Sequence, residues 1–228
     1  MTGVEATLMT EAASAPAPPS PAATVKVWDL VVRGGHWVLL AAVATALITR
    51  GEPESIHQFA GYVIVGWIVV RLFWGIAGPP SARFESFLTA PGKAVGYLAD
   101  LLRGRARRHV GHSPAGGWMA VALMVALSGS AVTGLAMENR VAPPALLAPV
   151  MGAGEVGEAY EAGEAAEAGE GGERGESPWE EVHEAFANLV LLLVILHVAG
   201  VALASVAHRE NLAQAMVTGR KRAPEAEA

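Results

Sequence analysis

Residues 180–212 read "EEVHEAFANLVLLLVILHVAGVALASVAHRENL". The run from 182 to 207 is apolar enough, and long enough as a helix, to cross about 30 Å of hydrocarbon. Two histidines interrupt it, His183 near its start and His197 in its middle. Hydrocarbon offers no partner to an imidazole nitrogen, and a buried polar group without a partner is costly. The stretch therefore predicts a membrane helix that presents two histidines to a site.

Three further apolar stretches have similar length, at about 27–49, 56–78 and 115–137. The chain is 52% hydrophobic and only 17% charged, a balance typical of membrane proteins. We therefore expect an all-α integral membrane protein, a four-transmembrane-helix bundle formed by one domain over residues 25–222. Residues 1–24 are rich in Ala and Pro and predict a disordered tail, and 223–228 form a short C-terminal tail.

The sequence contains no cysteine. This excludes disulfides, thiolate metal sites, iron–sulfur clusters and covalent haem attachment through a C-x-x-C-H motif.

Most Lys and Arg residues lie before the first span, between the second and third, and after the fourth. The positive-inside rule places both termini and the middle loop in the cytoplasm, and we expect the bacterial inner (cytoplasmic) membrane. Within that loop, Val95, Leu98, Leu101 and Leu102 share one helical face. This pattern predicts an interfacial helix on the cytoplasmic leaflet.

The loop between the third and fourth spans, at about 153–177, carries a glutamate at every third position from Glu155 to Glu176. A period of three fits neither a helix face nor a strand, so we expect a solvated, acidic, low-complexity segment. It either steers a basic partner such as a soluble cytochrome c or is an insertion without a specific role.

Depth sorts four histidines into two pairs. His36 and His197 lie at matching depths from the cytoplasmic side. His57 and His183 both lie in the first turns of spans that begin on the outer side. Fourteen residues of helix place His183 and His197 on one face, about 21 Å apart. The predicted pairs are therefore His36–His197 and His57–His183. This geometry suits two stacked haems, each with two axial histidines as iron ligands.

Other interpretations of these histidines remain open. Each could bond a neighbouring serine or carbonyl, or the four could carry a metal ion or proton in a transporter. A bare metal ion needs three or four ligands at one level, and transporters usually place Asp or Glu at membrane depth. The sequence shows neither feature within the spans.

Several other residues are weaker candidates. His208 lies near the stripe of His197, but at the interface, and His109 and His112 are expected in an exposed loop. Arg71 is expected to snorkel to the cytoplasmic side rather than pair with a haem propionate. Gly34 and Gly35 leave room beside His36, and "SGSAVTG" at 128–134 is expected to wall a haem.

These motifs together resemble the bacterial cytochrome b561 and nickel–iron hydrogenase b-type cytochrome family. The resemblance covers about 25–140 and 177–222. It rests on "VWDLVVRGGHW" at 27–37, "HQFAGYVIVGWIVVRLFWG" at 57–75, "GHSPAGGWM" at 111–119 with "TG" at 133–134, "WEEVHEAFANLVLLLVILHVAG" at 179–200, "HRENL" at 208–212 and "TGRKR" at 218–222. "GG" before His36 departs from the usual bulky residues, which predicts looser packing there, and the glutamate-rich loop has no family template.

The resemblance implies two haem b groups bound by His36, His57, His183 and His197. It also implies electron transfer between the quinone pool and a partner redox protein in a respiratory chain. The expected partners are the lipid bilayer, a quinone or quinol, and a soluble cytochrome c or a hydrogenase; no nucleic acid is expected, and a homodimer is left open. Whether the chain is itself a quinone oxidoreductase, or the cytochrome b subunit of a larger oxidoreductase, is also open.

Overall fold

A computed structural model describes residues 23–50, 52–139 and 179–223 of the chain. Most of the predicted N-terminal tail, the acidic loop and most of the C-terminal tail lie outside these residues. Four described helices are long and apolar enough to cross a membrane: α1 (Leu30–Thr49), α2 (Glu54–Ala77), α4 (Pro114–Glu138) and α7 (Trp179–Ala207).

The start of α1 is fixed by a side-chain cap. Asp29 accepts hydrogen bonds from the backbone N–H groups of Val31 and Val32, at 2.8 and 3.0 Å. The sequence placed this helix from about residue 27. It begins later because the amide of Val27 donates instead to the carbonyl of Gly219, at 2.8 Å.

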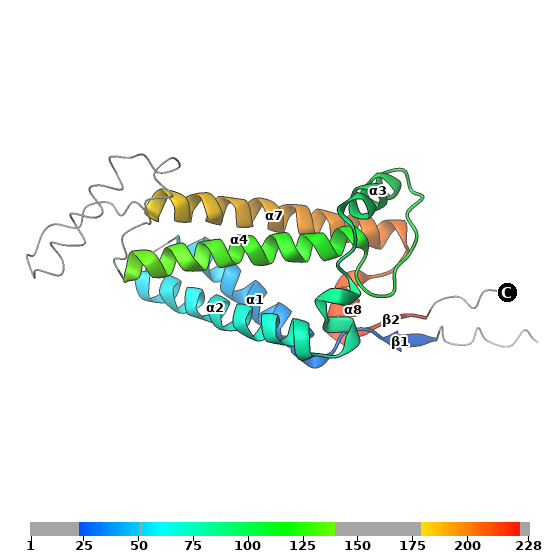
Figure 1. Ribbon diagram of the computed structural model, residues 1–228, viewed down its shortest axis with the longest axis horizontal. Coiled ribbons are helices and arrows are strands. Elements are labelled where there is room, and N and C mark those ends of the chain that lie inside the picture. Colours follow the sequence, from blue (N-terminus) through cyan, green and yellow to red (C-terminus); the bar gives the residue numbers. More distant parts are fainter. Residues whose placement is uncertain (1–22, 51, 140–178, 224–228) are drawn as a thin grey trace, which may run out of the picture.

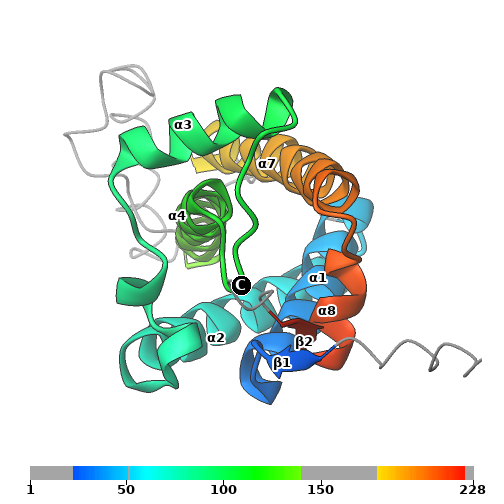
Figure 2. The ribbon, with the colours of Figure 1, turned by 90° about the vertical axis from the view of Figure 1, so that its right-hand side faces the viewer.

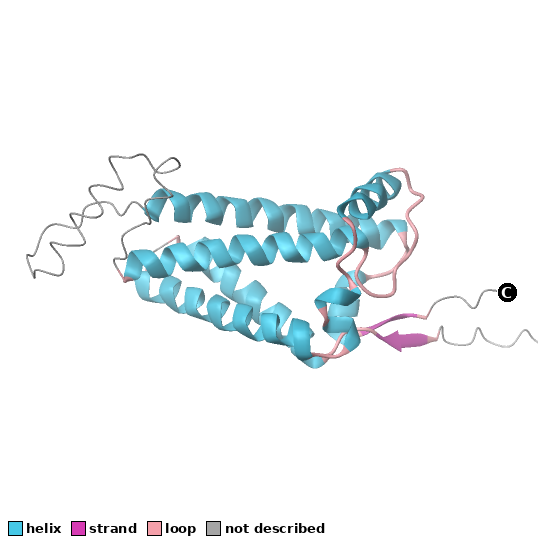
Figure 3. Ribbon diagram, in the orientation of Figure 1, coloured by secondary structure: helices cyan, strands magenta, loops and turns pink. Residues whose placement is uncertain are grey.

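The helices pack as two antiparallel layers (Figures 1 and 3). α1 lies along α2, α4 lies along α7, and α2 also contacts α4. All four helices contribute to a central core, which consists of Ala42, Val43, Ile64, Ala126, Leu127 and Val190. Many large apolar side chains point outward, with Ile48, Ile76 and Val206 all more than 75% exposed. Such a surface suits lipid rather than water.

Both ends of the described chain meet at one end of the bundle, which we call the termini end. Strand β1 (Thr24–Lys26) pairs antiparallel with β2 (Arg220–Arg222), which follows the short helix α8 (Leu212–Thr218). Figure 2, viewed from this end, shows α8 beside the start of α1. The opposite end, where α1 leads into α2, is the far end.

The segment between α2 and α4 lies at the termini end. Two short 3₁₀ turns, η1 (Pro80–Ala82) and η2 (Phe84–Ser86), precede helix α3 (Pro91–Leu102), which crosses α4 and α7 (Figure 2). The expected helix is present, but its predicted apolar face divides. Leu101 is buried, whereas Val95, Leu98 and Leu102 remain exposed. The reason is that α3 packs against the bundle through the face that carries Tyr97 and Leu101.

Candidate functional site

The four candidate histidines lie together in two pairs between the layers. The ring centroids of His36 on α1 and His197 on α7 are 6.4 Å apart. Those of His57 on α2 and His183 on α7 are 6.1 Å apart. These are the two pairs that helical depth predicted, and α7 supplies one imidazole to each.

The apolar core separates the two pairs. Val190 is seven residues from both His183 and His197, so about 10 Å of helix lies between it and each of them. Ile64 is likewise seven residues beyond His57 on α2. The bundle therefore holds two imidazole pairs at two levels, with packed hydrocarbon side chains between the levels.

The spacing within each pair fits one metal atom between two imidazoles. Two metal–nitrogen bonds of about 2 Å, with about 1 Å from each ligand nitrogen to its ring centre, span about 6 Å. No group of three or more His, Cys, Asp or Glu side chains suited to a metal ion occurs among the described residues. Each pair therefore fits a metal whose other ligands come from outside the chain, as the porphyrin nitrogens of haem do.

At the far end, His183 is oriented by α4. Its Nδ1 lies 3.0 Å from the carbonyl oxygen of Ser130 and 3.1 Å from the Thr133 hydroxyl oxygen. The Thr133 hydroxyl donates to the carbonyls of Gly129 and Ser130, so its oxygen accepts from the ring. Because both partners of Nδ1 are acceptors, the proton lies on Nδ1 and the ring lone pair lies on Nε2.

His57 has the same arrangement with α1. Its Nδ1 lies 3.2 Å from the carbonyl oxygen of Ala46 and 3.2 Å from the Thr49 hydroxyl oxygen. The Thr49 hydroxyl donates to the carbonyls of Thr45 and Ala46. A threonine and a helix carbonyl thus fix the tautomer of both far-end histidines, as partners of metal-binding histidines commonly do.

Sequence analysis missed Thr49 and Thr133. Their available signal was a threonine at the outer end of a span, close to the predicted depth of a histidine on another helix. The expectation that "SGSAVTG" would line the site agrees with the structure at Gly134, where a Cβ would lie 3.3 Å from the ring of His183.

At the termini end, the histidines are surrounded differently. The Nδ1 atom of His36 is buried and has no hydrogen-bond partner among the described residues. The ring lies edge-on to Trp37, with centroids 5.5 Å apart. The looser packing expected at the glycine pair is found only at Gly34, because a Cβ on Gly35 would overlap the indole of Trp67.

A charged cluster covers the termini end. Arg108 makes two hydrogen bonds to Glu210, at 2.7 and 3.1 Å, and also donates to the carbonyl of Arg222. The pair is largely buried, with 19% and 9% of the two side chains exposed. Burial raises the pKa of Glu210, whereas hydrogen bonds from Arg108 and from the Arg222 amide lower it. The lowering is the larger effect, so the net shift of the pKa is downward. The cluster ties the loop before α4 to the C-terminal segment.

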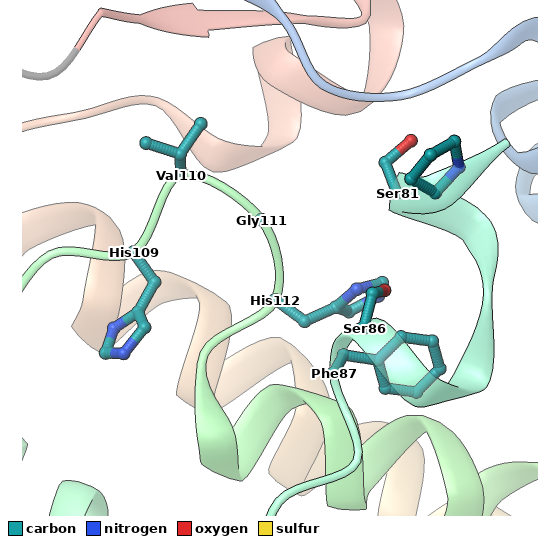
Figure 4. Close-up of a pocket in the computed structure, with 8 residues that line it drawn as sticks. Ser81, Ser86, Phe87, His109, Val110, Gly111 and His112 are labelled. Carbon is teal, nitrogen blue, oxygen red and sulfur yellow. The ribbon is translucent and has the colours of Figure 1, made fainter.

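A cavity of about 420 Å³ lies beside this cluster (Figure 4). His112 points across it toward Ser86 and Phe87, whereas His109 points away from them. The cavity is lined by Pro80, Ser81, Ser86, Phe87, His109, Val110, Gly111 and His112.

His112 does not lie in an exposed loop as the sequence suggested. Its ring lies 4.6 Å from that of Trp28 and 4.4 Å from that of Phe87. Burial, followed by the charges of Arg71 and Lys221, lowers the pKa of His112 to about 4. It is therefore a neutral, packed side chain at physiological pH.

His208 bonds outside the two pairs. Its Nε2 lies 3.1 Å from the hydroxyl of Tyr97 on α3, which ties the end of α7 to that helix.

Comparison with known proteins agrees with this geometry. The family model described as prokaryotic cytochrome b561 matches residues 27–219, which include all four paired histidines. Neither a curated protein nor a solved structure matches the chain. Members of the matched family are all-helical membrane proteins that bind haem b and transfer electrons. The chain belongs to the prokaryotic cytochrome b561 family and is a multi-pass membrane b-type cytochrome.

Proposed function

We propose that this chain binds two haem b groups and carries electrons between the quinone pool and a partner redox protein in a respiratory chain. His36 and His197 hold one haem at the termini end, and His57 and His183 hold the other at the far end. The observation that carries this proposal is the pair of imidazole separations, 6.4 and 6.1 Å, at two levels of one bundle. Each bound haem supplies an iron atom that accepts and releases one electron.

The chain's own residues set the ligation. Thr133 and Thr49 hold the Nδ1–H groups of the far-end histidines, so that Nε2 is the ligand atom. Each haem would be held by two histidines of the chain, and such ligation would favour electron transfer over oxygen chemistry. The apolar core between the levels excludes water from the space between the pairs.

The orientation that we propose places the termini end in the cytoplasm, with the chain in the bacterial inner membrane. The described loop before α4 and the C-terminal segment are rich in arginine and lysine, and the hydrogen bonds of Arg108 to Glu210 and Arg222 place both at the same end. The haem at His57 and His183 then lies near the outer surface. A quinone in the membrane and a soluble cytochrome c or a hydrogenase are the partners of this proposal.

The decisive experiment measures haem b per chain in purified, detergent-solubilised protein by pyridine haemochrome absorbance. A ratio near two is expected. A ratio near zero in folded protein, expressed with ample haem, would overturn the proposal and favour a histidine-based transporter of metal ions or protons. A ratio near one would retain one haem-binding pair and reject the other.

A further inference from the structure

Two cations stand out within the described membrane spans. Arg33 on α1 and Arg71 on α2 are the only Lys or Arg residues of α1, α2, α4 and α7. Arg33 is three residues before His36. Arg71 is four residues, or about one turn, beyond Trp67, whose indole packs against Gly35. Both cations therefore lie about one turn nearer the termini end than the His36–His197 pair.

Arg71 is held in place by two aromatic rings, and Asp29 is a nearby carboxylate whose charge acts on it without a direct ion pair. Its guanidinium carbon lies 4.8 Å from the ring centre of Phe84 and 5.9 Å from that of Phe87. Its Nη1 is buried without a hydrogen-bond partner, and no ion pair joins it to a carboxylate of the described residues. The aromatic rings fix the planar group, while at least one strong donor remains unsatisfied.

Arg33, on the neighbouring helix, also has a buried guanidinium nitrogen without a hydrogen-bond partner. Its Nη1 donates to the carbonyl of Val217 at 2.7 Å, whereas its Nε is buried without a partner. A buried charged donor without an acceptor is costly. Asp29 supplies one negative charge beside these two cations, so a net positive charge remains that a further anion would balance. The far end has no cation in its spans.

We propose that Arg71, with Arg33, binds the propionate carboxylates of the haem held by His36 and His197. This inference rests on the proposed function. Haem b carries two carboxylates on one edge, and a guanidinium fork matches a carboxylate in shape and charge. The two arginines would hold these carboxylates at the termini end. Arg71 is a binding residue in this proposal, which takes up the propionate alternative to snorkelling.

The test is a redox titration of the haems in Arg71→Gln, Arg71→Lys and wild-type protein. Arg107→Gln is the matched control, because it removes an arginine from the exposed loop without altering the site. The termini-end component is identified as the one absent from His197→Ala. A cation beside a haem favours its reduced form, so Arg71→Gln should shift this component to a more negative midpoint potential. Arg71→Lys should restore most of the shift, and Arg107→Gln should cause none.

The other possible outcomes distinguish failure of this inference from failure of the proposed function. An unchanged termini-end potential in Arg71→Gln, with two haems retained, leaves the two-haem proposal standing and removes Arg71 from the propionates. Loss of one haem in Arg71→Gln with recovery in Arg71→Lys supports the inference. Equal haem loss in both variants contradicts it, because the charge then has no effect. Absence of two haems from the wild-type protein is a failure of the proposed function instead.

Discussion

The two ends of the bundle orient their histidines by different means. At the far end, each Nδ1 is bonded to a helix carbonyl and a threonine hydroxyl of the neighbouring helix. At the termini end, the Nδ1 of His36 has no partner among the described residues, and tryptophans pack around the helix beside it. Hydrogen bonds therefore fix one pair, whereas aromatic packing and nearby arginines surround the other. We expect the two ends to respond differently to mutation and to acid.

The largest expected effect follows removal of a ligand from one end. His183→Ala should lower haem b from two to one per chain by loss of the far-end haem, and His197→Ala should do the same at the termini end. Both variants should remain folded, because the core between the levels is unchanged. Haem content and redox titration measure the result. Loss of both haems from either folded variant would contradict the pairing.

Removal of a far-end hydroxyl should have the next largest effect. Thr133→Val keeps the shape of the side chain but removes one acceptor for Nδ1 of His183. Loss of such a partner typically lowers metal affinity about 10–100-fold, and the Ser130 carbonyl should keep the loss near the lower value. Haem transfer to an excess of a haem-binding apoprotein measures the change.

The matched control for this experiment is Thr45→Val. Among the described residues, the Thr45 hydroxyl donates only to the carbonyl of Ala41 on its own helix. Equal rates of haem loss from Thr133→Val, Thr45→Val and wild type would show that the hydroxyl does not support the ligand.

Acid should destabilise the termini end through His112. Its pKa is about 4 in the folded chain against 6.5 without the fold, so the unfolded chain binds more protons between these values. The stabilisation is complete above pH 6.5 and is lost as the pH falls toward 4, by roughly 3 kcal/mol. His112→Gln should flatten this part of the profile of thermal unfolding against pH.

His109→Gln, in the same loop, is the control for this profile. The steep region between pH 6.5 and 4 should persist in that variant. Its persistence in His112→Gln would assign the acid sensitivity to another group.

The last comparison separates two adjacent glycines at the termini end. Gly35→Ala forces a methyl group into the indole of Trp67 and should destabilise the protein by about 1–3 kcal/mol. Gly34→Ala meets no atom within 4 Å and should be neutral or stabilising by up to about 1 kcal/mol. Thermal unfolding measures both, and an equal response would contradict the packing of Trp67 on α1.

Much of the architecture could be predicted from the sequence, because span length and histidine depth depend only on the regular rise of a helix. The matching depths of His36 with His197 and of His57 with His183 follow from that rule, and the structure adds their proximity. Their role as ligands remains a prediction. Thr49 and Thr133 could not be assigned, because their bonds depend on which faces of two helices meet.

Other features that the sequence did not predict also depend on how distant segments of the chain meet. The burial of His112 and Leu101 depends on how the segment between α2 and α4 folds back onto the bundle. The β1–β2 ribbon joins two three-residue strands from opposite ends of the chain, and neither is long enough to give a strand pattern. The aromatic neighbours of Arg71 could not be assigned from the sequence, because they follow a turn after α2.

The sequence by itself determined four apolar spans, two histidine levels and a concentration of positive charge on one side of the membrane. Each of these is a property of a single helix or of composition. Only the tertiary structure decided that hydroxyls hold the far-end imidazoles and that Phe84 and Phe87 pack against Arg71. The reason is physical: contacts between distant residues depend on the relative rotation and tilt of packed helices, which side-chain shapes throughout the core determine together.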